Sequence, residues 1–317
     1  MIGSVPSIWT IIGRQLPTTC SVLTHLNTID LKTPPFAAKR WALRTRELSF
    51  GNIPLIMGIL NLTPDSFSDG GLYYTVQSAV DQAKRLEDQG ADILDIGGES
   101  TRPYSQVVSQ SDELDRVMPV LERLQGKIAI PISIDTMKAK VASAAIELGA
   151  EIINDVSGLE SDPEMIEVAR VRQAGVCAMH MQGTPQTMQD KPTYTDVVAD
   201  VLAYLKSRDG WLVEQGIAPE RICLDPGVGF GKTHAHNLEL LQNASAFHAT
   251  GRPILVGHSR KGFIAKLLGN KDLDRCFGTV GVSLALALHR IQILRVHDVA
   301  ANKQALQLFS ASLGFSE

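Results

Sequence analysis

Residues 130–155 read IPISIDTMKAKVASAAIELGAEIIND, and the pattern of this stretch recurs through most of the chain. A short β-branched run ends at Asp135, an amphipathic segment occupies Lys138–Leu148, and a second apolar run ends in an Asn-Asp pair. Gly149 stands between the segment and the second run, where a left-handed residue commonly ends a helix. The stretch therefore predicts a strand, a helix and a second strand parallel to the first.

The same alternation continues from about residue 50 to the C-terminus. The apolar runs that predict strands are Ile53–Leu60, Ile93–Ile96, Ile130–Ile134, Ile152–Ile153, Val176–Met179, Ile222–Leu224, Ile254–Val256 and Ile291–Val296. The segments that predict helices are Thr75–Gln89, Ser111–Leu124, Lys138–Leu148, Pro163–Arg172, Tyr194–Glu214, Asn237–Ala246, Lys261–Arg290 (in one or two pieces) and Val299–Leu308. Near-continuous apolar strands that alternate with helices are typical of a helix-covered parallel sheet. Eight such units predict an α/β protein with a (β/α)8 TIM barrel, and a doubly wound open sheet is the alternative.

The composition narrows the possible classes of partner. The 317 residues carry a formal net charge of −4, and 44% of them are hydrophobic. These values are typical of a globular protein and show no global basic excess that would indicate nucleic-acid binding. No apolar run reaches the roughly 18 residues that a membrane span needs. The four cysteines are widely spaced and form no C-x-x-C pair, so we expect a cytoplasmic protein. From the charge and the short apolar runs, we expect neither nucleic acid nor membrane as a partner.

The first 48 residues differ from the rest of the chain. They contain six Lys or Arg residues and only two acids, Asp30 and Glu47, and four prolines interrupt them. No hydrophobic period persists in this segment. We therefore expect residues 1–48 to form a poorly ordered N-terminal extension, and residues 49–317 to form a single barrel domain.

Polar side chains follow the predicted strands at the point where each strand ends. Asn61, Asp135, Asn154 and Asp225 are examples. Each has an ordinary explanation, since Asp135 can cap the next helix and Asp225 can belong to a turn. In a TIM barrel, however, the carboxyl ends of all strands meet at one face, where the active site lies. The joint occurrence of these residues therefore indicates a binding site.

The residue types at these positions indicate the chemistry of the ligand. Carboxylates and carboxamides such as Asp135, Asn154 and Asp225 can pair with the donor and acceptor edge of a heterocycle. Cationic and imidazole side chains that can hold a phosphate or a carboxylate are Arg102, Lys261, Arg295 and His297. The sequence therefore favours a flat, nitrogen-rich ligand together with an anion.

Long motifs in the sequence resemble one enzyme family. The segment 57–71, MGILNLTPDSFSDGG, resembles the first signature of the dihydropteroate synthases, and 95–103, DIGGESTRP, resembles the second. The similarity continues in the motifs Ser133–Thr136, Ile153–Asp155, His180–Pro185, Asp225–Lys232, Ser259–Lys261 and Arg295–Asp298. These motifs extend from about residue 50 to 300, and the family has a (β/α)8 fold, which agrees with the strand count.

The resemblance implies a reaction of folate biosynthesis. The family joins (7,8-dihydropterin-6-yl)methyl diphosphate to 4-aminobenzoate, which gives 7,8-dihydropteroate and diphosphate. Its members use Mg²⁺, are usually homodimers, and are inhibited by sulfonamides, which imitate 4-aminobenzoate. By the same resemblance, diphosphate leaves first and the amine then attacks the pterin methylene.

The resemblance also assigns roles to individual residues. The pterin would be bound by Asp135, Asn154, Asp225 and Lys261, with Met179 and Arg295 packed on its faces. Diphosphate would be bound by Asn61, Arg102, Arg295 and His297, with Asn61 near Mg²⁺. The 4-aminobenzoate would contact Thr101, Pro103, Phe230, Ser259 and Lys261. The catalytic residues would be Asp135, Lys261, Arg295 and His297.

The sequence departs from the family pattern at two positions. The family leads us to expect an aliphatic residue where His258 stands and a serine where Gly262 stands.

A pterin-binding methyltransferase would share the Asp and Asn pattern but would not need the 100–103 loop or the Arg-x-His motif. A non-catalytic pterin-binding paralogue would have lost loop residues that remain here. A metal-dependent hydrolase would carry H-x-H on its first strand, whereas the pair His234 and His236 is expected in a solvated loop.

Overall fold

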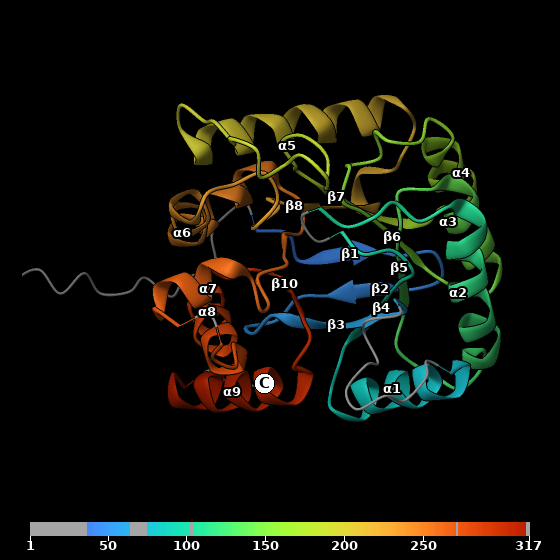
Figure 1. Ribbon diagram of the computed structural model, residues 1–317, viewed down its shortest axis with the longest axis horizontal. Helices are drawn as coiled ribbons and strands as arrows, with labels where there is room; N and C mark the ends of the chain where they lie inside the picture. The colour runs from blue at the N-terminus through green and yellow to red at the C-terminus, as the bar shows by residue number, and fades with distance from the viewer. Residues whose placement is uncertain (1–36, 64–74, 102–103, 271, 315–317) are drawn as a thin grey trace, which may run out of the picture. The chain divides into compact units, whose positions relative to one another are not determined.

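A computed structural model describes residues 37–63, 75–101, 104–270 and 272–314, all of which belong to one compact unit. Its central feature is a sheet of eight parallel strands in the order β8-β7-β6-β5-β4-β3-β10-β9. A bridge between Leu224 of β8 and Ile254, just before β9, brings the two edges of this sheet together. The sheet is therefore a nearly closed barrel, and the predicted TIM-barrel fold is confirmed (Figure 1).

The eight strands lie where the apolar runs predict them. Their bounds are β3 Leu55–Asn61, β4 Ile93–Gly97, β5 Ile132–Asp135, β6 Ile152–Asp155, β7 Gly175–Met179, β8 Ile222–Asp225, β9 Leu255–Val256 and β10 Ile293–Val296. Most of their residues are buried, because one side faces the barrel interior and the other faces the helices. This two-sided burial explains the continuous apolar runs.

The helices surround the strands, as Figure 1 shows. Their bounds are α1 Val76–Asp88, α2 Gln110–Leu124, α3 Ala139–Glu147, α4 Met165–Arg172, α5 Val197–Glu214, α6 His234–Gln242, α7 Gly262–Leu267, α8 Cys276–Leu288 and α9 Val299–Ser312. Two short 3₁₀ helices, η3 Pro219–Arg221 and η4 Ala244–Thr250, complete the described elements. The predicted segment Lys261–Arg290 thus forms two helices.

The sixth predicted helix is displaced along the sequence. Helix α6 begins at His234, three residues before the expected start, because the Thr233 side chain caps it by accepting a hydrogen bond from the His236 backbone amide. The expected C-terminal part belongs to η4 instead. His234 and His236 therefore lie in the first turn of a helix, and the prediction that they lie in a loop is wrong.

The amino-terminal end of the barrel is covered by a two-stranded hairpin. Strands β1 (Arg40–Ala42) and β2 (Glu47–Ser49) pair in antiparallel fashion. Trp41 is fully buried, and its Nε1 donates a hydrogen bond to the carbonyl oxygen of Arg221 at 2.9 Å. Trp41 and Leu43 pack against the inward-facing residues Met57, Ile93, Ile152, Cys177, Cys223, Leu255 and Ile293.

This hairpin corrects the expected boundary of the domain. We expected all of residues 1–48 to be poorly ordered, but the strands at 40–49 are part of the barrel unit. The reason is that Trp41 and Leu43 fill the apolar end of the barrel. Residues 1–36 lie outside the described residues. In the part of the chain that is described, no helix is long and apolar enough to cross a membrane.

We predict that Trp41→Ala lowers the free energy of unfolding by about 3–5 kcal/mol, because it opens a cavity at the sealed end of the barrel. Denaturant unfolding followed by circular dichroism measures this loss. Trp211→Ala is the matched control, because Trp211 lies on α5 and is 38% exposed. Equal losses in the two variants would contradict the role assigned to the hairpin.

Candidate active site

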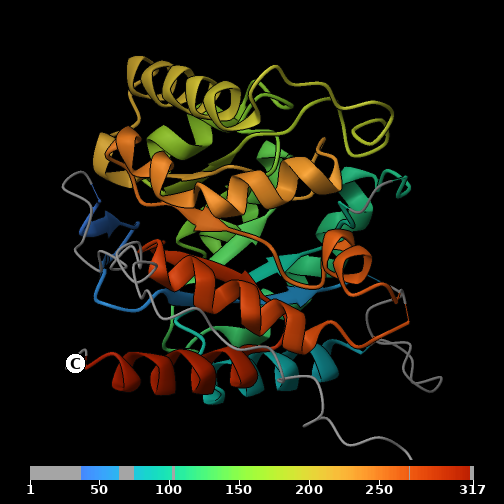
Figure 2. The same ribbon diagram turned by 90° about the vertical axis from the view of Figure 1, so that its left-hand side faces the viewer.

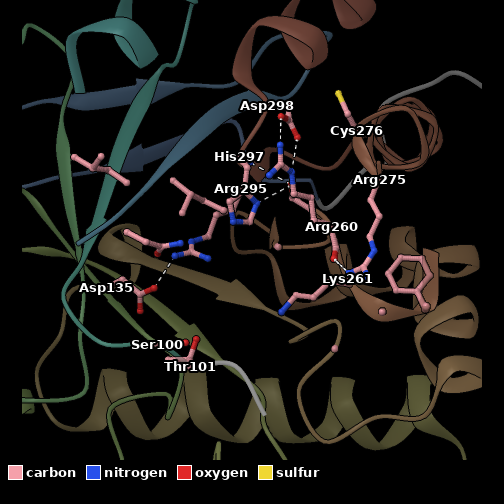
Figure 3. Close-up of a pocket in the computed structure, with 18 of the residues that line it drawn as sticks. Ser100, Thr101, Asp135, Arg260, Lys261, Arg275, Cys276, Arg295, His297 and Asp298 are labelled. Carbon is pink, nitrogen blue, oxygen red and sulfur yellow. Dashed lines mark hydrogen bonds and ion pairs between the residues drawn. The ribbon is translucent and has the colours of Figure 1, made fainter. Parts of the chain in front are cut away.

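The carboxyl ends of the strands surround a cavity of about 1450 Å³ (Figure 3). It is lined by the predicted site residues Asn61, Thr101, Asp135, Phe230, Ser259, Lys261, Arg295 and His297. Three further predicted residues, Asn154, Met179 and Asp225, are buried at the ends of β6, β7 and β8. The barrel therefore brings together all the predicted site residues that the structure describes. Arg102 and Pro103 lie outside the described residues.

One arginine links two carboxylates at the centre of this site. Arg295 Nε lies 2.6 Å from Asp95 Oδ2, and Arg295 Nη2 lies 2.6 Å from Asp135 Oδ2. Asn154 Nδ2 lies 3.3 Å from each carboxylate oxygen of Asp95. Asp95 is fully buried in the middle of the apolar strand β4. Strands β4, β5, β6 and β10 are thus joined by one polar network, of which Figure 3 shows the contact between Arg295 and Asp135.

Burial raises the pKa of two carboxyl groups in this site, those of Asp135 and Asp225. The pKa of Asp135 is raised to about 7, because burial and then the nearby carboxylate of Asp95 outweigh the attraction of Arg295. The pKa of Asp225 is raised to about 6 by burial, which the Gly227 amide and Lys261 oppose. Arg295 has a raised pKa because of the two carboxylates, so it stays charged. Near neutral pH the site can therefore both donate and accept hydrogen bonds at its carboxyl groups.

Neither Asp135 nor His297 caps the helix that follows it. Helix α3 begins at Ala139, and the Ala139 amide is capped by Asp162 Oδ2 at 2.8 Å, so Asp135 is not its cap. Helix α9 follows Asp298 without a side-chain cap, so His297 does not cap it either. His297 Nδ1 instead lies 3.0 Å from the hydroxyl of Ser259. Both side chains line the cavity.

A second part of the site combines a cation and an aromatic ring. Lys261 Nζ lies 4.0 Å from the centroid of the Phe230 ring. Phe230 belongs to the glycine-rich loop after β8, and Lys261 directly precedes α7. At the rim, Arg260 makes two hydrogen bonds to the Asp298 carboxylate, at 2.9 and 2.5 Å (Figure 3). This part of the cavity suits a flat ring that carries a negative charge.

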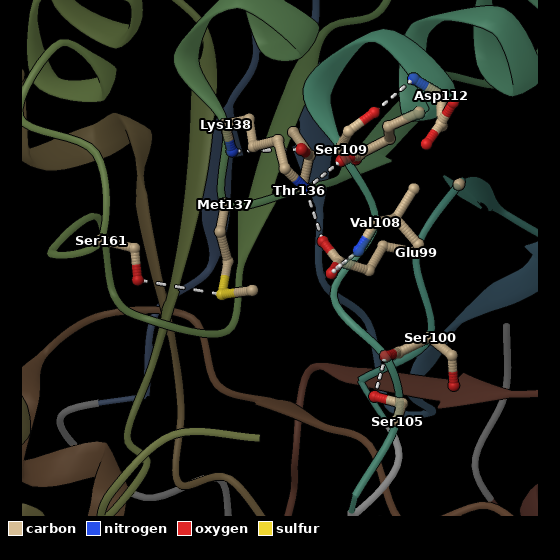
Figure 4. Close-up of polar contacts among 12 residues, drawn as sticks. Glu99, Ser100, Ser105, Val108, Ser109, Asp112, Thr136, Met137, Lys138 and Ser161 are labelled. Carbon is tan, nitrogen blue, oxygen red and sulfur yellow. Dashed lines mark hydrogen bonds and ion pairs between the residues drawn. The ribbon is translucent and has the colours of Figure 1, made fainter. Parts of the chain in front are cut away.

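The loop that carries Thr101 is closed at its base by a buried network (Figure 4). Glu99 Oε1 accepts a hydrogen bond from the Val108 amide at 3.0 Å, and Ser105 Oγ donates to the Ser100 carbonyl oxygen at 2.5 Å. Glu99 Oε2 also pairs with Lys138 Nζ at 2.5 Å, and Lys138 pairs in turn with the fully buried Glu113. The two ends of this loop are therefore attached to the segment that follows Asp135.

Three residues of the site were not predicted from the sequence. Asp95, Glu99 and Lys232 were noted only as parts of motifs, without a role. Asp95 could have been found, because a carboxylate inside an apolar strand needs a buried partner. Glu99 and Lys232 gave no comparable signal, because their partners lie far away in the sequence.

The two departures from the family lie beside the site. His258 is fully buried, and its Nε2 lies 2.9 Å from Ser283 Oγ and 3.2 Å from the carbonyl oxygen of Thr279. These partners belong to α8, so His258 joins the end of β9 to this helix. Burial lowers the pKa of His258 to about 4, which keeps the ring neutral. Gly262 is exposed at the first position of α7.

Comparisons with known proteins agree with this geometry. The model of the family described as pterin binding enzyme matches residues 57–297. The dihydropteroate synthase of Neisseria meningitidis serogroup C is 47% identical over 262 residues, which are 81% of this chain and 92% of that protein. The enzyme of Escherichia coli K12 is 43% identical over 83% of this chain and 93% of its own length.

Solved structures of this class have the same fold. A Yersinia pestis dihydropteroate synthase in a sulfonamide drug complex matches with a TM-score of 0.82 and 41% identity, over 87% of this chain and 99% of that one. The Xanthomonas albilineans enzyme with 4-aminobenzoic acid matches with a TM-score of 0.81 and 43% identity, over the same fractions. Fold and site thus define a pterin-binding TIM barrel. More narrowly, the chain belongs to the dihydropteroate synthase family of transferases.

We predict that Asp135→Asn raises the melting temperature relative to the wild type, and that this difference grows from pH 4 to pH 7. In the wild type the folded state binds more protons than the unfolded state between the ordinary pKa of 3.8 and the folded pKa of about 7, so its stability falls as pH rises through this range. Asparagine does not titrate, so the variant lacks this pH-dependent loss of stability. Melting curves at pH 4.5, 6 and 7.5 measure it. A difference that is constant with pH would contradict the raised pKa.

Proposed function

We propose that this chain condenses (7,8-dihydropterin-6-yl)methyl diphosphate with 4-aminobenzoate to form 7,8-dihydropteroate and diphosphate in folate biosynthesis. The observation that carries the proposal is the convergence of Asp135, Asn154, Asp225 and Arg295 at the cavity beside the Phe230–Lys261 pair. The Xanthomonas albilineans enzyme, which is 41% identical in that comparison, has a solved structure with 7,8-dihydropteroate, and this likeness supports the proposal.

The pterin lies at the carboxylate end of the cavity. Its amino and ring nitrogen groups pair with Asp135, Asn154 and Asp225, which can supply both acceptors and donors. Met179 is 3% exposed at the end of β7 and packs on one face of the ring, while the Arg295 guanidinium packs on the other. The raised pKa values of Asp135 and Asp225 allow each group to match a donor or an acceptor of the heterocycle.

The diphosphate is bound by Arg295, His297 and Asn61, together with Arg102. Arginine and histidine side chains bind phosphate oxygens through charge-assisted hydrogen bonds. Among the described residues there is no group of three or more His, Cys, Asp or Glu that could hold a metal. Asn61 lines the cavity, and its amide oxygen would be a ligand for Mg²⁺. When bound, Mg²⁺ neutralises the charge of the leaving diphosphate.

The reaction proceeds by loss of diphosphate before attack by the amine. The methylene C–O bond breaks, and its electron pair leaves on the diphosphate, whose charge Arg295 and His297 compensate. The Asp135 carboxylate and the pterin ring stabilise the cation that remains. The amine of 4-aminobenzoate is positioned by Thr101, Ser259, Lys261, Phe230 and Pro103, forms the C–N bond and releases a proton. No protein nucleophile takes part.

Two further properties belong to the same proposal. The exposed faces of α8 and α9 carry Phe277, which is 85% exposed, and Leu308, which is 71% exposed. The two helices lie side by side (Figure 2), and their outward faces are our candidate for the interface of a homodimer. The widely spaced cysteines and the absence of a membrane-spanning helix among the described residues are consistent with the cytoplasmic location that we propose.

The direct test is formation of 7,8-dihydropteroate by the purified protein from the two substrates and Mg²⁺. We expect product that requires Mg²⁺ and that decreases when a sulfonamide competes with 4-aminobenzoate. Binding of the pterin without product would instead indicate a pterin-binding methyltransferase or a non-catalytic paralogue, and would overturn the proposal.

We predict that Lys261→Met lowers kcat/KM by about 100-fold or more, since it removes a charged contact of the substrates and leaves the aliphatic stem in place. Steady-state kinetics with each substrate varied in turn measures the change. Lys266→Met is the matched control, because Lys266 is exposed on α7 only five residues away. A similar loss in both variants would show that the effect arises from α7 and not from the cavity.

A further inference from the structure

One buried lysine that lines the cavity has no role in the proposed reaction. Lys232 stands at the end of the glycine-rich loop after β8 and is only 2% exposed. Its Nζ lies 2.9 Å from His180 Nδ1, 2.9 Å from the carbonyl oxygen of Phe230 and 3.4 Å from that of His180. In the part of the chain that the structure describes, none of the hydrogen-bond partners of this amine is a carboxylate. A buried lysine with such neutral partners is costly, and the cost requires an explanation.

The contacts of Lys232 join two loops that follow neighbouring strands. His180 directly follows β7, and the loop of residues 226–232 follows β8, which pairs with β7 in the barrel (Figure 1). Phe230, whose carbonyl oxygen Lys232 binds, contacts Lys261 through its ring. Lys232 therefore holds the backbone of the residue that carries this ring.

The two loops approach each other too closely for any side chain between them. A Cβ atom at Gly227 would lie 1.9 Å from the carbonyl oxygen of His180, and a Cβ atom at Gly231 would lie 2.4 Å from that of Gln182. Both glycines have positive φ angles, 69° and 60°. The glycines permit this close approach, but they contribute no side-chain contact that could hold it.

The loop has other anchors besides Lys232, one of which is the Gly227 amide, which donates to Asp225 Oδ1 at 2.7 Å. Gly229 donates its amide hydrogen to Asn237 Oδ1 at 2.6 Å and accepts a hydrogen bond from Gln189 Nε2 at 3.0 Å. The Tyr194 hydroxyl donates to the carbonyl oxygen of Gly231 at 2.7 Å. The Phe230 carbonyl oxygen accepts the hydrogen bond from Lys232, and the Phe230 amide donates within the loop to the carbonyl oxygen of Gly227 at 3.1 Å.

The state of His180 fits this role. Burial and then the charge of Lys232 lower the pKa of His180 to about 3, so the ring is neutral. A neutral imidazole can accept at Nδ1 while Nε2 carries the hydrogen. Lys232 has at least two hydrogens in either protonation state and can donate to Nδ1 and to the Phe230 carbonyl oxygen at once. The contact is therefore maintained across the neutral pH range.

We propose that Lys232 is a positioning residue, which docks the loop after β8 onto His180 and thereby holds the Phe230 ring against 4-aminobenzoate. This inference rests on the proposed function, because that function assigns 4-aminobenzoate to Phe230. Lys232 touches no reacting atom in this account. Its loss therefore weakens binding of the second substrate and leaves the pterin end of the cavity intact.

The test compares the two Michaelis constants of Lys232→Met, which keeps the aliphatic stem and removes the donors. We expect KM for 4-aminobenzoate to rise at least tenfold, while KM for the pterin diphosphate changes less than threefold. Lys232 lowers the pKa of Asp225, so its loss raises that pKa. The assay is therefore run at pH 8, where Asp225 is ionised in both proteins. Lys206→Met, on the exposed face of α5, is the control.

A second variant keeps the proposal testable if Lys232→Met does not fold. His180→Leu removes one acceptor and leaves Lys232 two carbonyl oxygens, so we expect the same selective rise in KM at a smaller magnitude. Unchanged constants in a folded variant, or equal rises for both substrates, would overturn the positioning role. Failure of the proposed function would appear differently, as absence of dihydropteroate from the wild-type protein.

Discussion

The structure of the site depends on the sharing of one guanidinium by two buried carboxylates. Arg295 contacts Asp95 and Asp135 at 2.6 Å each, and these three residues come from β10, β4 and β5. A buried charge without a partner is strongly destabilising, so each carboxylate requires Arg295, and Arg295 requires at least one of the two carboxylates. The barrel supplies this arrangement because parallel strands end at one face. Burial raises the pKa of Asp135, and the second carboxylate that shares this single cation raises it further.

One end of the barrel stabilises the fold, and the other end carries the cavity. At the amino-terminal end, Trp41 and Leu43 of the hairpin cover an apolar cluster of strand residues. At the carboxyl end, carboxylates and cations surround an open cavity and reduce stability there. Apolar packing at one end thus supports a polar arrangement of buried charges at the other.

Local patterns predicted most of the fold. The eight strands and most helices follow from apolar periodicity, because each element is buried by its own side chains. The hairpin at 40–49 could not be predicted in this way, since Trp41 is buried by contacts with strands far along the chain and bonds to Arg221. The start of α6 was misplaced because the cap formed by Thr233 was not recognised.

The site was predicted partly from the residues and partly from a family resemblance. Asp135, Asn154, Asp225 and Lys261 stand at strand ends, so a barrel places them together whatever the ligand is. Their roles toward pterin and 4-aminobenzoate came from the resemblance alone. The docking of the 226–232 loop on His180 was not predictable, because it depends on the geometry of two loops and on backbone carbonyl groups.

The central claim is that this cavity ionises the pterin substrate before the amine attacks. Positional isotope exchange tests it most directly. Pterin diphosphate that carries ¹⁸O in the oxygen between methylene and phosphorus is incubated with the protein and Mg²⁺, without 4-aminobenzoate. The account predicts that ¹⁸O moves into the non-bridging positions of recovered substrate, because diphosphate departs, rotates and returns. Label that stays in place, with product forming only when the amine is added, would contradict the account.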